Sequence, residues 1–86
     1  MNTNFQMLRE LLQKYHPQER GIASAEEIEL VEKTLCIKEM NVLALRNLRD
    51  FTVAFLGDSD KAEDWDRMSA ITYIIDSEIF KKGGEV

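Results

Sequence analysis

Residues 26–56 have the sequence EEIELVEKTLCIKEMNVLALRNLRDFTVAFL, thirty-one residues without a glycine or a proline. Such a stretch favours helix, because glycine and proline are the residues that interrupt a helix most strongly. Its apolar residues fall on more than one helical face, whereas a helix lying on a protein surface needs only one apolar stripe. The stretch therefore predicts helices that are buried on more than one side.

The apolar stripe of this stretch changes its angular position halfway along. The first stripe comprises Ile28, Val31, Leu35 and Val42, and the second comprises Leu45, Leu48, Thr52 and Phe55. At about 100° per residue the two stripes are displaced by roughly 130°. This shift predicts a break between Cys36 and Asn41, with Asn41 as the cap of the following helix. One continuous helix over 25–56 is the alternative, because residues 30–55 also contain a weak heptad seam.

Signals on both sides of this stretch mark where helices begin and end. Pro17 should end a first helix, since proline disfavours helical backbone at the residue before it. Ser24 and Glu27 have the spacing of a capping box, so the second helix should begin at Ser24. We expect Gly57 to end the stretch as a left-handed cap. A second capping box, from Asp60 to Glu63, should then open a last helix, which Gly83 and Gly84 end.

These signals predict an all-α fold, a small bundle of four helices in a single domain over residues 1–86. We expect helices near 4–16, 25–36, 40–56 and 61–81, with boundaries good to about two to four residues. No segment alternates with period two, so we expect no strands. The expected core consists of Leu8, Leu11, Leu12, Val31, Leu35, Leu48, Phe55, Trp65, Met68, Ile75 and Ile79.

The chain of 86 residues has a net charge of −5, and residues 57–86 hold eight acids against four bases. A domain that binds duplex DNA usually has a basic face, so we expect no nucleic-acid partner. No run approaches the roughly 18 apolar residues of a membrane span, and the N-terminus lacks a signal pattern. We therefore expect a cytoplasmic protein without a membrane partner. A core this small is often supplemented by disulfides, metals or self-association. With one cysteine and one histidine, self-association remains, and we expect a homodimer.

The sequence contains no recognisable motif for catalysis, metal binding or nucleotide binding. His16 lies beside Pro17 with no partner in sequence, and Cys36 lies between apolar residues, where we expect a buried structural thiol. Residues 58–69 begin like a calcium loop, but Glu63 and Ser69 stand where an EF-hand needs glycine and glutamate. The glycines form no phosphate-binding loop. We therefore expect no cofactor, no metal and no enzymatic activity.

The last helix has two aromatic residues that its core face does not need. Tyr73 and Phe80 lie seven residues apart on a different line from the apolar stripe of residues 65–79. They either close a second core seam or form an apolar strip for a partner. Five acids occupy residues 58–66, at the entrance of this helix. The candidate interaction residues are Tyr73, Phe80, Asp58, Asp60 and Asp64.

These observations favour a non-enzymatic protein with a regulatory, inhibitory or accessory role, acting by occlusion or assembly through protein–protein contact. The alternative is a helix-turn-helix regulator that reads DNA with Arg46 and Arg49. In its general character (short, acidic, helical and poor in motifs) the chain resembles small accessory proteins of prophages and other mobile elements. No diagnostic residue carries this resemblance, so it implies no residue-level role.

Overall fold

The structure is a computed structural model that describes residues 3–15 and 24–84. Four α-helices and one short 3-10 helix make up this part of the chain, and it contains no strand. The helices are α1 (Thr3–Lys14), α2 (Ala25–Thr34), η1 (Ile37–Glu39), α3 (Val42–Gly57) and α4 (Ala62–Lys81). The expected all-α bundle is confirmed. None of the described helices combines the length and apolar composition that crossing a membrane requires.

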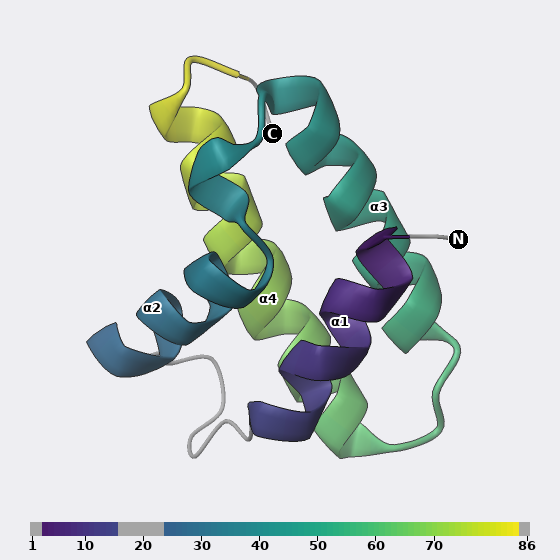
Figure 1. Cartoon of the computed structure of the whole chain (residues 1–86). Helices are drawn as coiled ribbons and strands as arrows, with labels where there is room; N and C mark the ends of the chain where they lie inside the picture. Colours follow the sequence, from purple (N-terminus) through teal and green to yellow (C-terminus); the bar gives the residue numbers. More distant parts are fainter. Residues whose placement is uncertain (1–2, 16–23, 85–86) are drawn as a thin grey trace.

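The antiparallel pair of α3 and α4 is the main packing unit of the molecule. On α4 also rest α2 and η1, while α1 packs on α2 and α3 (Figure 1). As the longest element, α4 meets neighbours along most of its length and has one face left for solvent. The fold therefore uses α4 as its central support.

The break within residues 26–56 lies where the shift between the apolar stripes predicted it. Cys36 has a left-handed backbone, with φ of 55°, and stands between the end of α2 and η1. Asn41 then caps α3, because its side-chain oxygen accepts a hydrogen bond from the amide of Ala44 at 2.8 Å. One continuous helix over 25–56 is therefore excluded.

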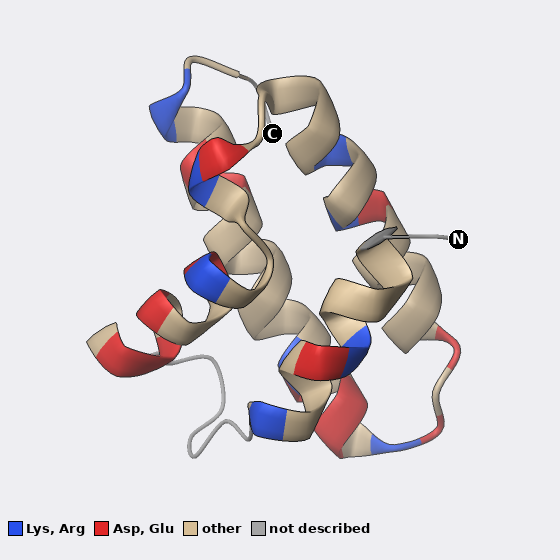
Figure 2. Ribbon diagram, viewed as in Figure 1, with Lys and Arg blue, Asp and Glu red and all other residues tan. Residues whose placement is uncertain are grey.

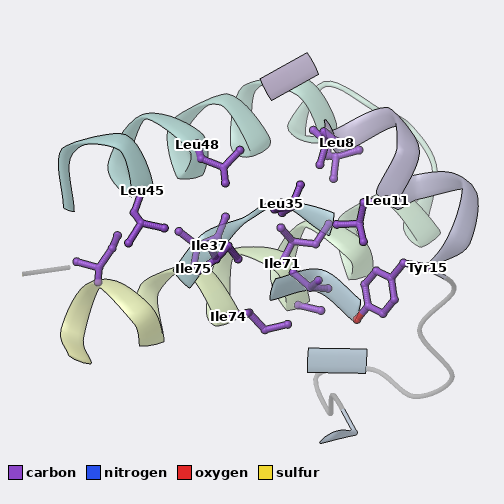
Figure 3. Packing of buried hydrophobic residues seen from close by; sticks show 14 residues of the cluster. Leu8, Leu11, Tyr15, Leu35, Ile37, Leu45, Leu48, Ile71, Ile74 and Ile75 are labelled. Atoms are coloured by element: carbon purple, nitrogen blue, oxygen red, sulfur yellow. The ribbon is translucent and has the colours of Figure 1, made fainter. Parts of the chain in front are cut away.

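The core lies between α4 and the other helices, and side chains from every helix contribute to it (Figure 3). Its buried apolar residues are Leu8, Leu11, Tyr15, Val31, Leu35, Ile37, Leu45, Leu48, Leu56, Ala70, Ile71, Ile74, Ile75 and Ile79. Seven of the eleven expected core residues belong to this set, and Leu12 and Met68 are partly buried against it. Phe55 and Trp65 were wrongly placed in the core, since they are 37% and 46% exposed.

The C-terminal end of α4 closes against the start of α3. Gly83 has a φ of 82°, and the amide of Gly84 donates to the carbonyl of Ile79 at 2.9 Å, which makes the expected glycine stop a Schellman motif. The ammonium group of Lys82 donates to the carbonyl of Lys38 at 3.0 Å and to that of Met40. These contacts fix the end of α4 on the segment that joins η1 to α3.

Tyr15 links the end of α1 to the start of α2. Its side chain is buried, and its hydroxyl interacts with the carboxylate of Glu27. Burial first, and then Glu27, raises the pKa of Tyr15 from 10.0 to about 12. The neutral phenol is thus favoured in the folded state. Its contribution to stability is complete below the unfolded pKa of 10 and is lost as the pH rises toward 12.

We predict that Tyr15→Phe removes part of the alkaline destabilisation of this protein. The free energy of unfolding of the wild type should fall more steeply between pH 10 and 12 than that of the variant, which has no phenol to ionise there. Urea unfolding at several pH values measures both slopes. Equal slopes for the two proteins would show that Tyr15 ionises alike in the folded and unfolded chains.

Candidate interaction surface

The outward face of α4 has a line of exposed residues on the side opposite the core. We call Ala62, Ser69, Tyr73 and Phe80 the α4 strip; all four are exposed. Tyr73 is 68% exposed and Phe80 is 75% exposed, so these two aromatic rings do not close a second core seam. The sequence left two alternatives open for these rings. Their exposure excludes a second core seam and favours the other alternative, an apolar strip on the outer side of α4.

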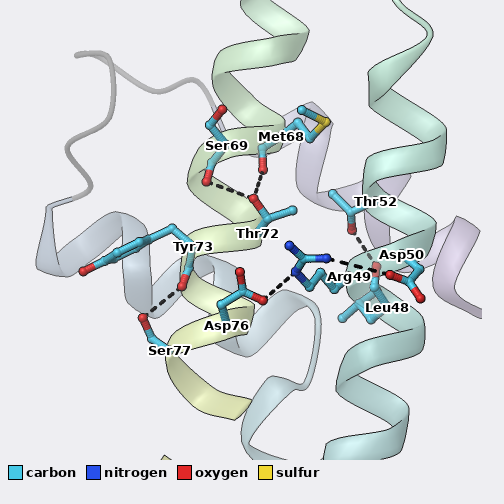
Figure 4. A network of polar contacts seen from close by, with 10 residues as sticks. All are labelled: Leu48, Arg49, Asp50, Thr52, Met68, Ser69, Thr72, Tyr73, Asp76 and Ser77. Carbon is cyan, nitrogen blue, oxygen red and sulfur yellow. Dashed lines mark hydrogen bonds and ion pairs between the residues drawn. The ribbon is translucent and has the colours of Figure 1, made fainter. Parts of the chain in front are cut away.

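An ion pair joins α3 to α4 beside the α4 strip, and further polar contacts lie within each of the two helices (Figure 4). Nε of Arg49 and Oδ1 of Asp76 form an ion pair at 2.6 Å, and both side chains are partly buried. The hydroxyls of Thr52 and Thr72 each donate to a carbonyl one turn back on their own helix, both at 2.8 Å. Tyr73 projects from α4 on the side away from Arg49, so it takes no part in this packing.

The entrance to α4 is acidic (Figure 2), but its acids differ in their exposure and in their contacts. Asp58 and Asp60 are exposed in the connection from α3 to α4. Asp64 is partly buried, and its Oδ2 accepts a hydrogen bond from the hydroxyl of Ser59 at 2.6 Å. Its other carboxylate oxygen lies 3.6 Å from Arg67. Asp64 therefore holds the connection together, which sequence spacing alone did not indicate.

Two expected caps at this entrance were wrong. Gly57 is the last residue of α3 and does not have the positive φ of a left-handed cap. The N-cap of α4 is Lys61, with no side-chain capping bond, where an Asp60–Glu63 box was expected. Ser59 makes contacts at both helix ends instead: its amide donates to the carbonyl of Leu56 at 3.2 Å, and its hydroxyl accepts from the amide of Lys61 at 3.1 Å. Its carbonyl also accepts from the indole of Trp65 at 2.9 Å.

A second aromatic group lies where α1 meets α3, and the sequence analysis missed it. Phe5 meets Phe51 and Phe55 edge-on, with ring centroids 6.4 and 5.3 Å apart, while Phe51 and Phe55 stack at 5.8 Å. Arg9 lies over the ring of Phe5 at 5.5 Å. Phe5 and Phe55 are 36% and 37% exposed, about half as much as Tyr73 and Phe80, because the three rings cover part of one another. We therefore regard the group as a packing feature. The 4-residue spacing of Phe51 and Phe55 was its only local signal.

Arg46 and Arg49, which would contact DNA in the helix-turn-helix alternative, are not both available for such a contact. Arg49 pairs with Asp76 of α4 and lies 3.8 Å from the carboxylate of Asp50. Arg46 is exposed on the same helix. Seven residues, 35–41, separate α2 from α3, and each helix packs mainly on other elements. The usual motif joins two helices that pack on each other by a three- or four-residue turn.

Cys36 is exposed, which contradicts the expectation of a buried thiol. It lies after the end of α2 and lines a depression together with Glu29 and Lys33. Those two residues form an ion pair at 2.8 Å. Among residues 3–15 and 24–84, no three His, Cys, Asp or Glu side chains are grouped as a metal site would need. His16 and Pro17 lie outside the described residues.

Comparison of the chain with protein-family models, with curated proteins and with solved structures finds no match.

Proposed function

We propose that this protein acts by binding a protein surface through the α4 strip, without catalytic turnover. The observation that carries the proposal is the exposure of Tyr73 and Phe80, seven residues apart on a helix whose opposite face is filled by the core. Exposed aromatic residues at one surface are typical of interfaces, where they contribute much of the contact energy.

The charges at the two ends of α4 support the same proposal. Asp58 and Asp60 are exposed at its start, and Lys81 is exposed at its end, where the ammonium group of Lys82 is engaged by the carbonyls of Lys38 and Met40. Charged groups at the rim of an interface mainly raise the rate of encounter and select the orientation of the partner. Asp64 is left out of this role, because its carboxylate is engaged by Ser59.

We predict that the double variant Tyr73→Ser, Phe80→Ser loses its protein contacts while it keeps its fold. Both side chains are exposed, so their removal should leave far-ultraviolet circular dichroism unchanged. Immobilised wild type should retain a protein from extracts of the source cells, or a further copy of itself, and the double variant should lose at least about tenfold of this binding.

Leu43→Ser is the matched control for this experiment. Leu43 is 69% exposed on α3, so the substitution removes a comparable apolar side chain from outside the α4 strip. Equal binding by wild type and double variant would contradict the proposal. Binding of duplex DNA at physiological salt, lost on Arg46→Ala and Arg49→Ala, would replace it with the helix-turn-helix alternative.

A further inference from the structure

The α4 strip is divided into a half with small residues and a half with large ones. Ala62 and Ser69 lie in its N-terminal half, and Tyr73 and Phe80 lie in its C-terminal half. The intervals between the four residues are seven, four and seven, which is symmetric about a point midway between Ser69 and Tyr73. An antiparallel copy of α4, centred on that point, would place Tyr73 opposite Ser69 and Phe80 opposite Ala62. Each aromatic ring would then meet a small residue.

The spacing of the strip also suits helix-to-helix packing. With two acids included, its positions alternate between steps of four and three: Ala62, Asp66, Ser69, Tyr73, Asp76 and Phe80. This is the spacing of a coiled-coil seam, in which side chains of one helix fill holes on the other, although three of the six positions here are polar. From Ala62 to Phe80 the seam is about 27 Å long, at about 1.5 Å per residue.

The charges of α4 favour the antiparallel direction over the parallel one. Residues 58–66 hold five acids and one base, and Asp58 and Asp60 among them are exposed. At the other end Lys81 is exposed, whereas the ammonium group of Lys82 donates to the carbonyls of Lys38 and Met40. A parallel pair would bring two acidic entrances together, and like charges placed side by side oppose association. An antiparallel pair brings each acidic entrance to the basic end of the other copy.

We propose that the partner of the α4 strip is a second copy of this chain, packed antiparallel along α4 with a two-fold axis between Ser69 and Tyr73. The inference rests on the proposed function, since it names the occupant of the same strip. In this register Asp66 of one copy faces Asp76 of the other. The ion pair of 2.6 Å between Arg49 and Asp76 offsets that like-charge contact. Arg49 thereby supports the interface from the neighbouring helix.

The size of the contact sets the strength that we expect. One helix from each copy gives an interface at or below the low end of about 1,200–2,000 Å² for stable complexes. Interfaces of about 1,600 Å² already range down to micromolar affinity, so we expect a Kd in the micromolar range or above. This Kd should rise with salt, because the ends of the helices attract one another. At concentrations well above this, light scattering under reducing conditions should give about twice the 10.0 kDa mass of one chain.

An exchange of the two central residues tests the register. Tyr73→Ser leaves two serines facing each other at both central contacts, and Ser69→Tyr makes two tyrosines collide there. Each single variant should weaken the dimer by about 30-fold, since each change occurs twice across the axis. The double variant Ser69→Tyr, Tyr73→Ser restores one aromatic and one small residue at each contact. Its Kd should return to within about threefold of the wild type.

Sedimentation equilibrium of the four proteins, with Leu43→Ser as the control, gives the Kd of each. A wild type that stays monomeric at millimolar concentration, or a double variant as weak as the singles, would overturn the dimer. A different result would contradict the proposed function: the wild type and the double variant Tyr73→Ser, Phe80→Ser would capture a partner protein equally well. If a different protein recognises Tyr73, its binding should be lost on Tyr73→Ser and should stay lost in the double variant Ser69→Tyr, Tyr73→Ser. That result would also overturn the second copy as the partner.

Discussion

Replacing Leu48 by Ala should lower the free energy of unfolding by about 2–5 kcal/mol, the largest effect that we expect from a single substitution. Leu48 is fully buried on α3 within the contact to α4. Truncation removes apolar surface from the core and leaves a cavity that the surrounding helices fill only in part. A domain of this size has a total stability of only about 5–10 kcal/mol, so much of the variant should be unfolded near its working temperature.

Leu43→Ala is the control for that substitution, because it removes the same atoms from the same helix. Leu43 is 69% exposed, so its truncation should change the stability by less than about 0.5 kcal/mol. Ile75→Ala, at a buried position on α4, should behave like Leu48→Ala. Chemical unfolding followed by circular dichroism measures all three. Melting within a degree or two of the wild type for Leu48→Ala would remove Leu48 from the core.

Two glycine-to-alanine substitutions should act in opposite directions. A Cβ on Gly84 would lie 2.7 Å from Cγ2 of Ile79 and 2.9 Å from Cγ1 of Val42, and also 3.2 Å from the carbonyl of Ile79. Gly84→Ala must therefore displace the end of α4 from the start of α3, at a cost of about 1–3 kcal/mol. A Cβ on Gly57 would meet only the sulfur of Met68, at an ordinary 3.8 Å.

Gly57→Ala should stabilise the protein by about 0.4–1 kcal/mol, since alanine loses less backbone entropy than glycine in a helix. Thermal melts of the two variants beside the wild type give the sign of each change. A Gly84→Ala variant as stable as the wild type would show that the end of α4 is not packed as tightly against Ile79 and Val42 as these distances indicate. A destabilised Gly57→Ala variant would restore the left-handed cap that the sequence suggested.

Local sequence signals predicted the helices well, because capping and breaks depend on neighbouring residues. The shift between the apolar stripes, together with Asn41 as a cap, located the start of α3 to within two residues. The left-handed residue before α3 is Cys36, and the sequence did not indicate this conformation because the residue is not a glycine. At Gly57 the reverse happened: a residue suited to a left-handed cap stayed helical, and the amide of Ser59 closes the end of α3 by donating to the carbonyl of Leu56 at 3.2 Å.

The errors in the core have a different cause, since periodicity shows which face a residue is on and not how far a neighbour covers it. Phe55 shares a face with Leu48 but lies near the edge of α3, where it packs on Phe5 and stays half exposed. Trp65 lies on the apolar stripe of α4, yet it projects beyond the core and donates to Ser59. Ile74, outside that stripe, is buried.

The candidate surface was found because it did not fit a core. Tyr73 and Phe80 were singled out as aromatic residues off the main stripe, and both are exposed. The acids could not be sorted by sequence, because Asp58, Asp60 and Asp64 differ only in the contacts that the folded connection gives them. Ala62 and Ser69 complete the α4 strip, and the proposed dimer, in which they face Phe80 and Tyr73, becomes apparent only when two copies of α4 are considered together.

The most direct test of the α4 strip is the change of its backbone amide NMR signals when the wild-type protein is diluted. If the strip binds a second copy, dilution from millimolar to micromolar concentration should shift the signals of Ser69, Tyr73 and Phe80 and leave that of Leu43 in place. Shifts confined to Phe5, Phe51, Phe55 and their neighbours would show that the contact lies on α1 and α3 and not on α4. Signals that do not change with concentration would contradict the α4 dimer outright.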